Sequence, residues 1–229
     1  MNFSTKTTND ASYLQTADTL LVATKDWSGI VEQFPYGLGA LIFYIILFQS
    51  ELVPRWLSGW GLVGAALILA MGLLRLHGRP VFYLAIPIIL NELVLAGWFV
   101  VEGFNSSEIA YIIVGALFII ALVSVALNGT GSTDDPDRLA AFATNENKLL
   151  RGVLFQIVLI ASVVAIPIIM FPILREQNEV LALGYVGARI FEGFFDALIG
   201  LSMLMQLTLS REYVKESTPA AKKDIDETE

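Results

Sequence analysis

Six long apolar segments dominate this sequence, and they limit what the chain can fold into. Each is a continuous apolar run, whereas a membrane β-strand alternates apolar and polar residues, so helices are predicted. At about 1.5 Å of rise per residue, each segment can cross about 30 Å of hydrocarbon. We therefore predict an all-α, polytopic membrane protein, a bundle of six transmembrane helices at about residues 29–50, 56–76, 80–101, 109–127, 149–174 and 180–210.

Composition supports the same class of protein. Charged residues make up 16% of the 229-residue chain, against about 25% in an average soluble domain. A water-soluble surface needs more charge than this, so the lipid bilayer is the predicted partner and the cell membrane the predicted location, in multi-pass form. The net charge of −8 gives no support for nucleic-acid binding.

The two ends of the chain are more polar than the six segments. Apolar residues recur at helical spacing within 10–26, which predicts an interfacial amphipathic helix inside a polar N-terminal region, 1–28. The transmembrane domain then covers 29–210 and includes an acidic loop at 128–148. The charged tail, 211–229, is predicted to be disordered.

A few ionisable residues lie deep within the apolar segments. Arg189, Glu192 and Asp196 are spaced i, i+3 and i+7, so they share one helix face. Glu92 is near the middle of the third segment, beside Asn91. A charge at the centre of a bilayer costs about 2.5–3.5 kcal/mol on insertion scales. We therefore expect these groups to face inward and to form one intramembrane polar cluster.

One cation against three carboxylates leaves the predicted cluster with a formal charge of −2, which a proton, a cation or a water-filled cavity can compensate. We expect Arg189 to pair with Glu192 and with Glu92. Amides and hydroxyls in the apolar segments could add hydrogen bonds: Gln49, Gln156, Gln206, Tyr44 and Tyr185. The cluster then either fixes helix packing or binds a proton, a cation or a small polar ligand.

No catalytic arrangement is visible, so enzymatic activity stays uncertain and the cofactor is unknown. The single histidine, His77, lies in a short loop, which favours a solvated residue over a metal ligand. There is no cysteine, which excludes disulfides and thiol catalysis.

Orientation follows from the basic residues. With six crossings both ends share one side, and eleven cations are on that side: Lys6, Lys25, Arg75, Arg79, Arg138, Lys148, Arg151, Arg211, Lys215, Lys222 and Lys223. Only Arg55 and Arg175 lie opposite. The positive-inside rule then predicts cytoplasmic termini.

Several blocks resemble a family of small prokaryotic integral membrane proteins that is catalogued as a domain of unknown function. The loop signature Pro54-Arg55-Trp56 begins the first of them. The blocks are 48–50 with 54–61, 91–98 with 102–105, 145–147, 171–174, 181–192 and 207–214. Arg189, Glu192 and Glu92 fall inside these blocks, whereas Asp196 does not.

The order of the blocks departs from the family. In usual members the segment resembling 109–127 comes first, so this chain resembles a circular permutant. In relatives, the loops matching 50–56 and 174–179 carry extra lysines, which implies termini outside the cytoplasm. The resemblance and the charge count therefore predict opposite orientations.

Two functions from different classes fit these observations. The first is a transporter or ion- or proton-coupled protein with a polar site at the membrane midplane. The second is a non-catalytic scaffold, sensor or partner subunit, in which the same charges are structural.

Overall fold

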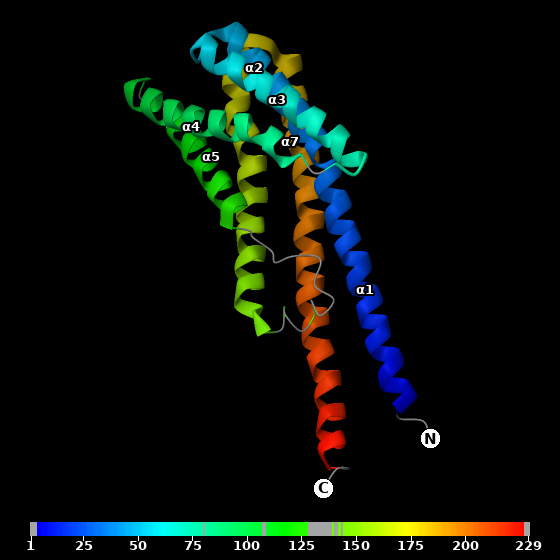
Figure 1. Ribbon diagram of the computed structural model, residues 1–229. Helices are drawn as coiled ribbons and strands as arrows, with labels where there is room; N and C mark the ends of the chain where they lie inside the picture. Colours follow the sequence, from blue (N-terminus) through cyan, green and yellow to red (C-terminus); the bar gives the residue numbers. More distant parts are fainter. Residues whose placement is uncertain are drawn as a thin grey trace.

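The computed structural model describes residues 4–79, 81–106, 109–127, 139, 142 and 144–226. The elements within these residues are helical, which confirms the all-α fold (Figure 1). They are α1 (Ser4–Val31), α2 (Gln33–Ser50), α3 (Arg55–Leu76), the 3-10 turn η1 (Phe82–Ala85), α4 (Ile86–Ser106), α5 (Ile109–Leu127) and α7 (Glu146–Asp226).

Helix α7 consists of two antiparallel halves, 146–177 and 179–226, that turn at Asn178. The backbone of Asn178 is extended, with φ −161° and ψ 105°. Its Oδ1 accepts a hydrogen bond from the backbone N–H of Leu181 at 3.0 Å, which makes it an N-cap for the second half. Five helical stretches are long and apolar enough to cross a membrane. Because the last contains both halves of α7, the part of the chain described here provides six passes.

The predicted amphipathic segment at 10–26 is helical, but it is not a separate element. Helix α1 runs almost directly into α2, since Glu32 keeps helical dihedrals and hydrogen bonds join Glu32 N–H to Ser28 O and Tyr36 N–H to Glu32 O. The small break has a local cause: Pro35 has no N–H to donate to the Val31 carbonyl. The first candidate membrane span accordingly begins within α1, at Tyr13, and ends at Ser50.

The C-terminal tail also differs from the prediction of disorder. Helix α7 continues through the charged residues to Asp226. The helix continues past Pro219, which disfavours a helix interior, and the Lys, Ala and Glu residues around it are good helix formers. Most of the predicted acidic loop at 128–148 lies outside the described residues.

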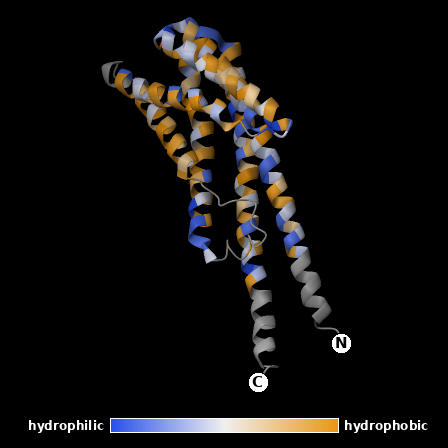
Figure 2. Ribbon diagram, in the orientation of Figure 1, coloured by the Kyte–Doolittle hydropathy of each residue, from blue (hydrophilic) through white to orange (hydrophobic). Residues whose placement is uncertain are grey.

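The helices pack so that both ends of the chain lie at the same end of the molecule (Figure 1). Helix α1 lies antiparallel to the second half of α7, α2 packs on α3 and α7, and α4 packs on α5. Apolar residues cover α4 and α5 on their outer faces, as expected for lipid contact (Figure 2).

Aromatic rings and close helix contacts form the core around α2 and α3. The ring of Phe43 stacks on that of Tyr185 with centroids 4.8 Å apart. Tyr44 lies directly against Gly61 of α3, where a Cβ atom would be only 2.2 Å from the Tyr44 ring. Only glycine therefore permits this approach of α3 to α2, as at small-residue contacts between membrane helices.

Candidate binding cavity between the helices

A cavity of about 300 Å³ lies between the helices. Its walls come from the α1–α2 junction, α3, η1 and α4, α5 and both halves of α7. Six acidic or basic residues line it: Glu32, Arg75, Glu92, Arg189, Glu192 and Asp196. Four of these, Glu92, Arg189, Glu192 and Asp196, are residues of the predicted polar cluster, and the structure brings them together around one space.

Arg189 and Glu192 form a buried ion pair within the second half of α7. Arg189 Nη1 donates to Glu192 Oε2 at 2.8 Å and to Oε1 at 3.0 Å. Both side chains are about 5% exposed. The Arg189 guanidinium also lies 5.5 Å from the centroid of the Tyr36 ring, within range of a cation–π interaction. The i, i+3 spacing that predicted a shared face thus produces a direct contact.

Asp196 accepts hydrogen bonds from Gln156, a residue in the first half of α7. Gln156 Nε2 donates to Asp196 Oδ1 at 3.0 Å and to the Asp196 backbone carbonyl at 3.1 Å. Both residues are buried. This amide hydrogen bond fixes the Asp196 carboxylate but leaves its formal charge uncompensated.

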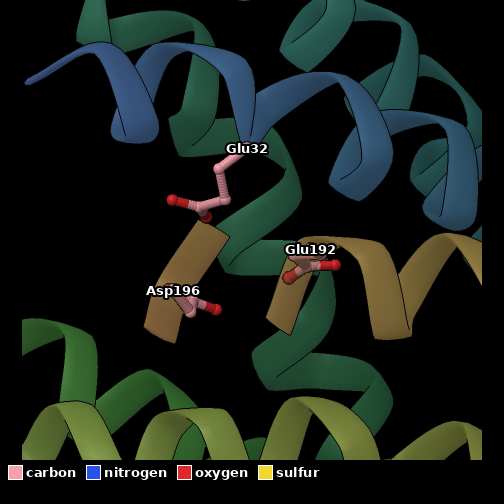
Figure 3. A group of neighbouring side chains, drawn as sticks. All are labelled: Glu32, Glu192 and Asp196. Carbon is pink, nitrogen blue, oxygen red and sulfur yellow. The ribbon is translucent and has the colours of Figure 1, made fainter. Parts of the chain in front are cut away.

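Glu32, which was not among the residues of the predicted cluster, completes a group of three neighbouring carboxylates. One carboxylate oxygen from each of Glu32, Glu192 and Asp196 lies within 4.8 Å of the other two. Figure 3 shows Glu32 reaching from the α1–α2 junction toward the helix that carries Glu192 and Asp196. In the sequence, Glu32 lies only three residues after the start of the predicted first segment, 29–50. This position is typical of a charged residue at the membrane surface, so it gave no sign of a deeply placed carboxylate.

Glu92 lines the cavity but is held by a different partner from the predicted one. Its Oε1 accepts a hydrogen bond from the Tyr36 hydroxyl at 2.9 Å. Among the described ion pairs, Arg189 pairs with Glu192 alone. Tyr36 contacts both groups: its hydroxyl bonds Glu92, and its ring faces the Arg189 guanidinium. Tyr36 therefore links Glu92 to Arg189, in place of the predicted direct ion pair.

Asn91 is the member of the predicted cluster that the structure separates from the cavity. It is fully buried, and its Nδ2 donates to the backbone carbonyl of Leu57 at 2.8 Å. Successive residues of a helix point in directions about 100° apart, so Asn91 and Glu92 face different neighbours. Asn91 therefore links α4 to the first turn of α3.

The loop signature lies at the start of α3, away from the cavity. Pro54 is the N-cap residue, and its carbonyl accepts the Leu57 and Ser58 N–H groups. Arg55 pairs with Glu51, and Trp56 is 60% exposed. These residues shape the α2–α3 connection. His77 lies at the other end of α3 in an exposed turn, where its Nδ1 contacts the Leu73 carbonyl.

Gln33 and Arg75 add polar groups that the sequence analysis did not select. The Gly29 carbonyl accepts from Arg75 Nη1 at 3.1 Å and from Gln33 Nε2 at 3.0 Å. Gln33 is 7% exposed, and its Oε1 has no hydrogen-bond partner in the described part of the chain. The Nε of Arg189 is likewise buried without a partner there. Two unsatisfied polar atoms thus belong to residues that line the cavity.

The cavity carries excess negative charge. Four carboxyl groups, those of Glu32, Glu92, Glu192 and Asp196, face two guanidinium groups, those of Arg75 and Arg189, so the formal sum is 2 − 4 = −2. Such a site attracts cations, including protons, because burial strengthens electrostatic interactions. The carboxylate, amide and carbonyl oxygens are also the ligands that a metal cation or an ammonium group would need.

A helical bundle with several apolar passes and a buried ionisable cavity defines a polytopic membrane protein. The chain belongs to the family described as "Domain of unknown function (DUF4386)", which matches residues 2–103 and 109–227. This confirms the family resemblance. No curated protein and no solved structure matches the chain.

Proposed function

We propose that this chain is a multi-pass transporter of the cell membrane that carries a cation, with the cavity as its binding site. The observation that carries the proposal is the formal charge of −2 on the six acidic and basic side chains around a space of about 300 Å³. Charged groups within membrane segments are costly and characteristically mark ion or substrate pathways. A bound cation would compensate the excess negative charge.

The position of the cavity also supports transport. All six passes contribute to its walls, so a change in the packing of either half of the bundle would alter access to the carboxylates. Alternating access in transporters uses a site of this kind, placed between elements that move relative to each other.

Flux measurements with the purified full chain in liposomes test the proposal. The probes are labelled Na⁺, Rb⁺, Mn²⁺ and benzyltrimethylammonium, each applied as an inward gradient. We expect protein-dependent uptake of at least one probe. Uptake should fall at least about tenfold in Asp196→Asn, because the site loses a buried anionic ligand.

Glu179→Gln is the matched control, since Glu179 is an exposed carboxylate on the same half of α7. It should leave uptake unchanged. The proposal is overturned if no probe shows protein-dependent uptake, or if Asp196→Asn transports as well as the unmodified chain.

A non-catalytic scaffold or partner subunit is the second candidate. The observation that favours it is the set of hydrogen bonds between elements, from Tyr36 to Glu92 and from Gln156 to Asp196, because such bonds fix helix register. A scaffold would tolerate replacement of the whole polar cluster by apolar residues of similar volume and would still bind its partner.

The permuted block order is a separate proposal about this chain. Two observations support it: the family match falls in two segments, 2–103 and 109–227, and α1 lies along the second half of α7. Permutation is tolerated where chain ends lie close together. A rearranged chain, in which residues 109–226 are joined by a flexible linker to residues 4–106, should fold with similar stability. Failure to fold would contradict the proposal.

A further inference from the structure

The cavity has two chemically different walls. The α1–α2 junction and the second half of α7 supply most of its polar side chains, including the three clustered carboxylates. The wall from α3, α4 and α5 carries Arg75 and Glu92 but is otherwise apolar, with Ile68, Met71, Ile88, Phe118 and Leu122 among its residues. A small hydrated ion would use the polar side chains of this cavity and leave its apolar surface without a role.

The unpartnered Gln33 Oε1 adds an independent indication of a ligand. It is an acceptor on a side chain that is more than nine-tenths buried, and it lines the same cavity as the carboxylates. A buried acceptor without a donor costs free energy, so such atoms commonly face a ligand or water. This oxygen is itself enclosed, so the Gln33 side chain would have to turn toward the cavity for an N–H donor or a positively charged group to satisfy it.

The rim of the cavity lies partly on the outside of the bundle. Ile89 of α4 and Val125 of α5 line the cavity and are also 44% and 56% exposed. The outer faces of these helices are those that contact lipid in a membrane. A ligand with a hydrocarbon body could therefore reach the cavity from the hydrocarbon layer.

We infer that the cavity binds an amphiphilic organic cation, an inference that rests on the proposed function. The ammonium group of this ligand lies at Glu32 and Asp196, and its hydrocarbon body lies against the wall formed by α3, α4 and α5. Arg189 already neutralises Glu192. Of the other three carboxylates that line the cavity, Glu92 accepts the Tyr36 hydroxyl, and Glu32 and Asp196 lie together in the carboxylate cluster. A volume of about 300 Å³ is at the lower end of the range for small-molecule sites.

Calorimetric titration of the full chain in nanodiscs tests this inference. The ligands are tetramethylammonium and its butyl-, hexyl- and octyl-trimethyl analogues, with Na⁺ and Mn²⁺ for comparison. Empty nanodiscs provide the correction for partition into lipid. We expect saturable binding that strengthens by about fourfold per added CH₂ group, as hydrocarbon leaves water for an apolar wall.

Two substitutions divide the contributions of the walls. Asp196→Asn should weaken every member of the series at least about tenfold. Leu122→Ala should weaken the octyl compound about threefold or more and leave tetramethylammonium unchanged, since only the longer ligand reaches that wall. Glu179→Gln and Leu127→Ala are the controls, because both residues are exposed and neither lines the cavity.

The outcomes distinguish this inference from the proposed function. Binding of Na⁺ or Mn²⁺ without chain-length dependence would overturn the organic cation and leave cation transport standing. Chain-length dependence that is equal in Leu122→Ala and in the unmodified chain would overturn the role of the apolar wall. The absence of binding by every cation, together with the absence of flux, would overturn both proposals.

Discussion

Two ion pairs of this protein have the same chemistry and different surroundings. Arg55 pairs with Glu51 at 2.5 Å, and the two side chains are 67% and 65% exposed. Arg189 pairs with Glu192 at 2.8 Å, and the two side chains are about 5% exposed. Both pairs are local in sequence. The first lies at the α2–α3 connection, and the second lies at the centre of the bundle.

The comparison shows that the environment decides what a pair can do. Solvent screens the Arg55–Glu51 pair, so it contributes little to stability or function. The Arg189–Glu192 pair has lost its hydration, and each partner depends on the other for compensation. It also lies beside two further carboxylates, those of Glu32 and Asp196. The buried pair is therefore part of a site, whereas the exposed pair shapes a turn.

The largest expected effect comes from breaking the buried pair. Arg189→Leu removes the guanidinium and leaves Glu192 among other carboxylates, so the free energy of unfolding should fall by about 3–5 kcal/mol. Denaturant titration in detergent micelles measures this change. A loss no larger than that of Arg55→Leu would contradict the distinction between the two pairs.

The next effect concerns the residue that links Glu92 to the pair. Tyr36→Phe removes the hydroxyl that bonds Glu92, and should cost about 1–3 kcal/mol because a hydrogen bond to a charged acceptor is lost. In double-mutant cycles, Glu92→Gln should couple more strongly with Tyr36→Phe than with Arg189→Leu. Stronger coupling with Arg189→Leu would instead restore the direct Arg189–Glu92 contact predicted from sequence.

Removing both members of the buried pair should be milder than removing one. The variant Arg189→Met with Glu192→Leu leaves no unpaired charge from the pair, and its stability should lie within about 2 kcal/mol of the unmodified chain. The measurement is the same unfolding titration. If the double variant is as unstable as Arg189→Leu, the unpaired charge of Glu192 is not the cause of the instability. The loss would then come from other contacts of these two side chains.

The smallest effect is expected at the exposed pair. Glu51→Gln should change the free energy of unfolding by no more than about 0.5 kcal/mol, because water solvates both partners after the change. Cation uptake should stay the same, since Glu51 does not line the cavity. A loss of uptake in Glu51→Gln would show that the α2–α3 connection takes part in the site.

Part of the site follows from local sequence. Helical spacing alone places Arg189, Glu192 and Asp196 on one face of a helix. The cost of charge within a membrane then predicts that this face points into the bundle. The same reasoning selects Glu92. It cannot decide which donor each carboxylate meets, because Tyr36 comes from α2 and Gln156 comes from the first half of α7.

Other residues could be placed only by the packed bundle. Glu32 joins Glu192 and Asp196 because α1 and α2 form one nearly continuous helix against the second half of α7. Asn91 leaves the cluster because its face of α4 meets the Leu57 carbonyl. Neither outcome can be derived from residue type or spacing along a single helix.

The class of protein, the six apolar passes and the charged face of the last helix can all be predicted from the sequence, because helical period and the cost of burying charge are local properties. The members of the carboxylate cluster, the partner of Glu92 and the largely apolar wall from α3, α4 and α5 emerge only from the packed bundle. These depend on which helix faces meet, and that is settled by packing between residues far apart in the chain.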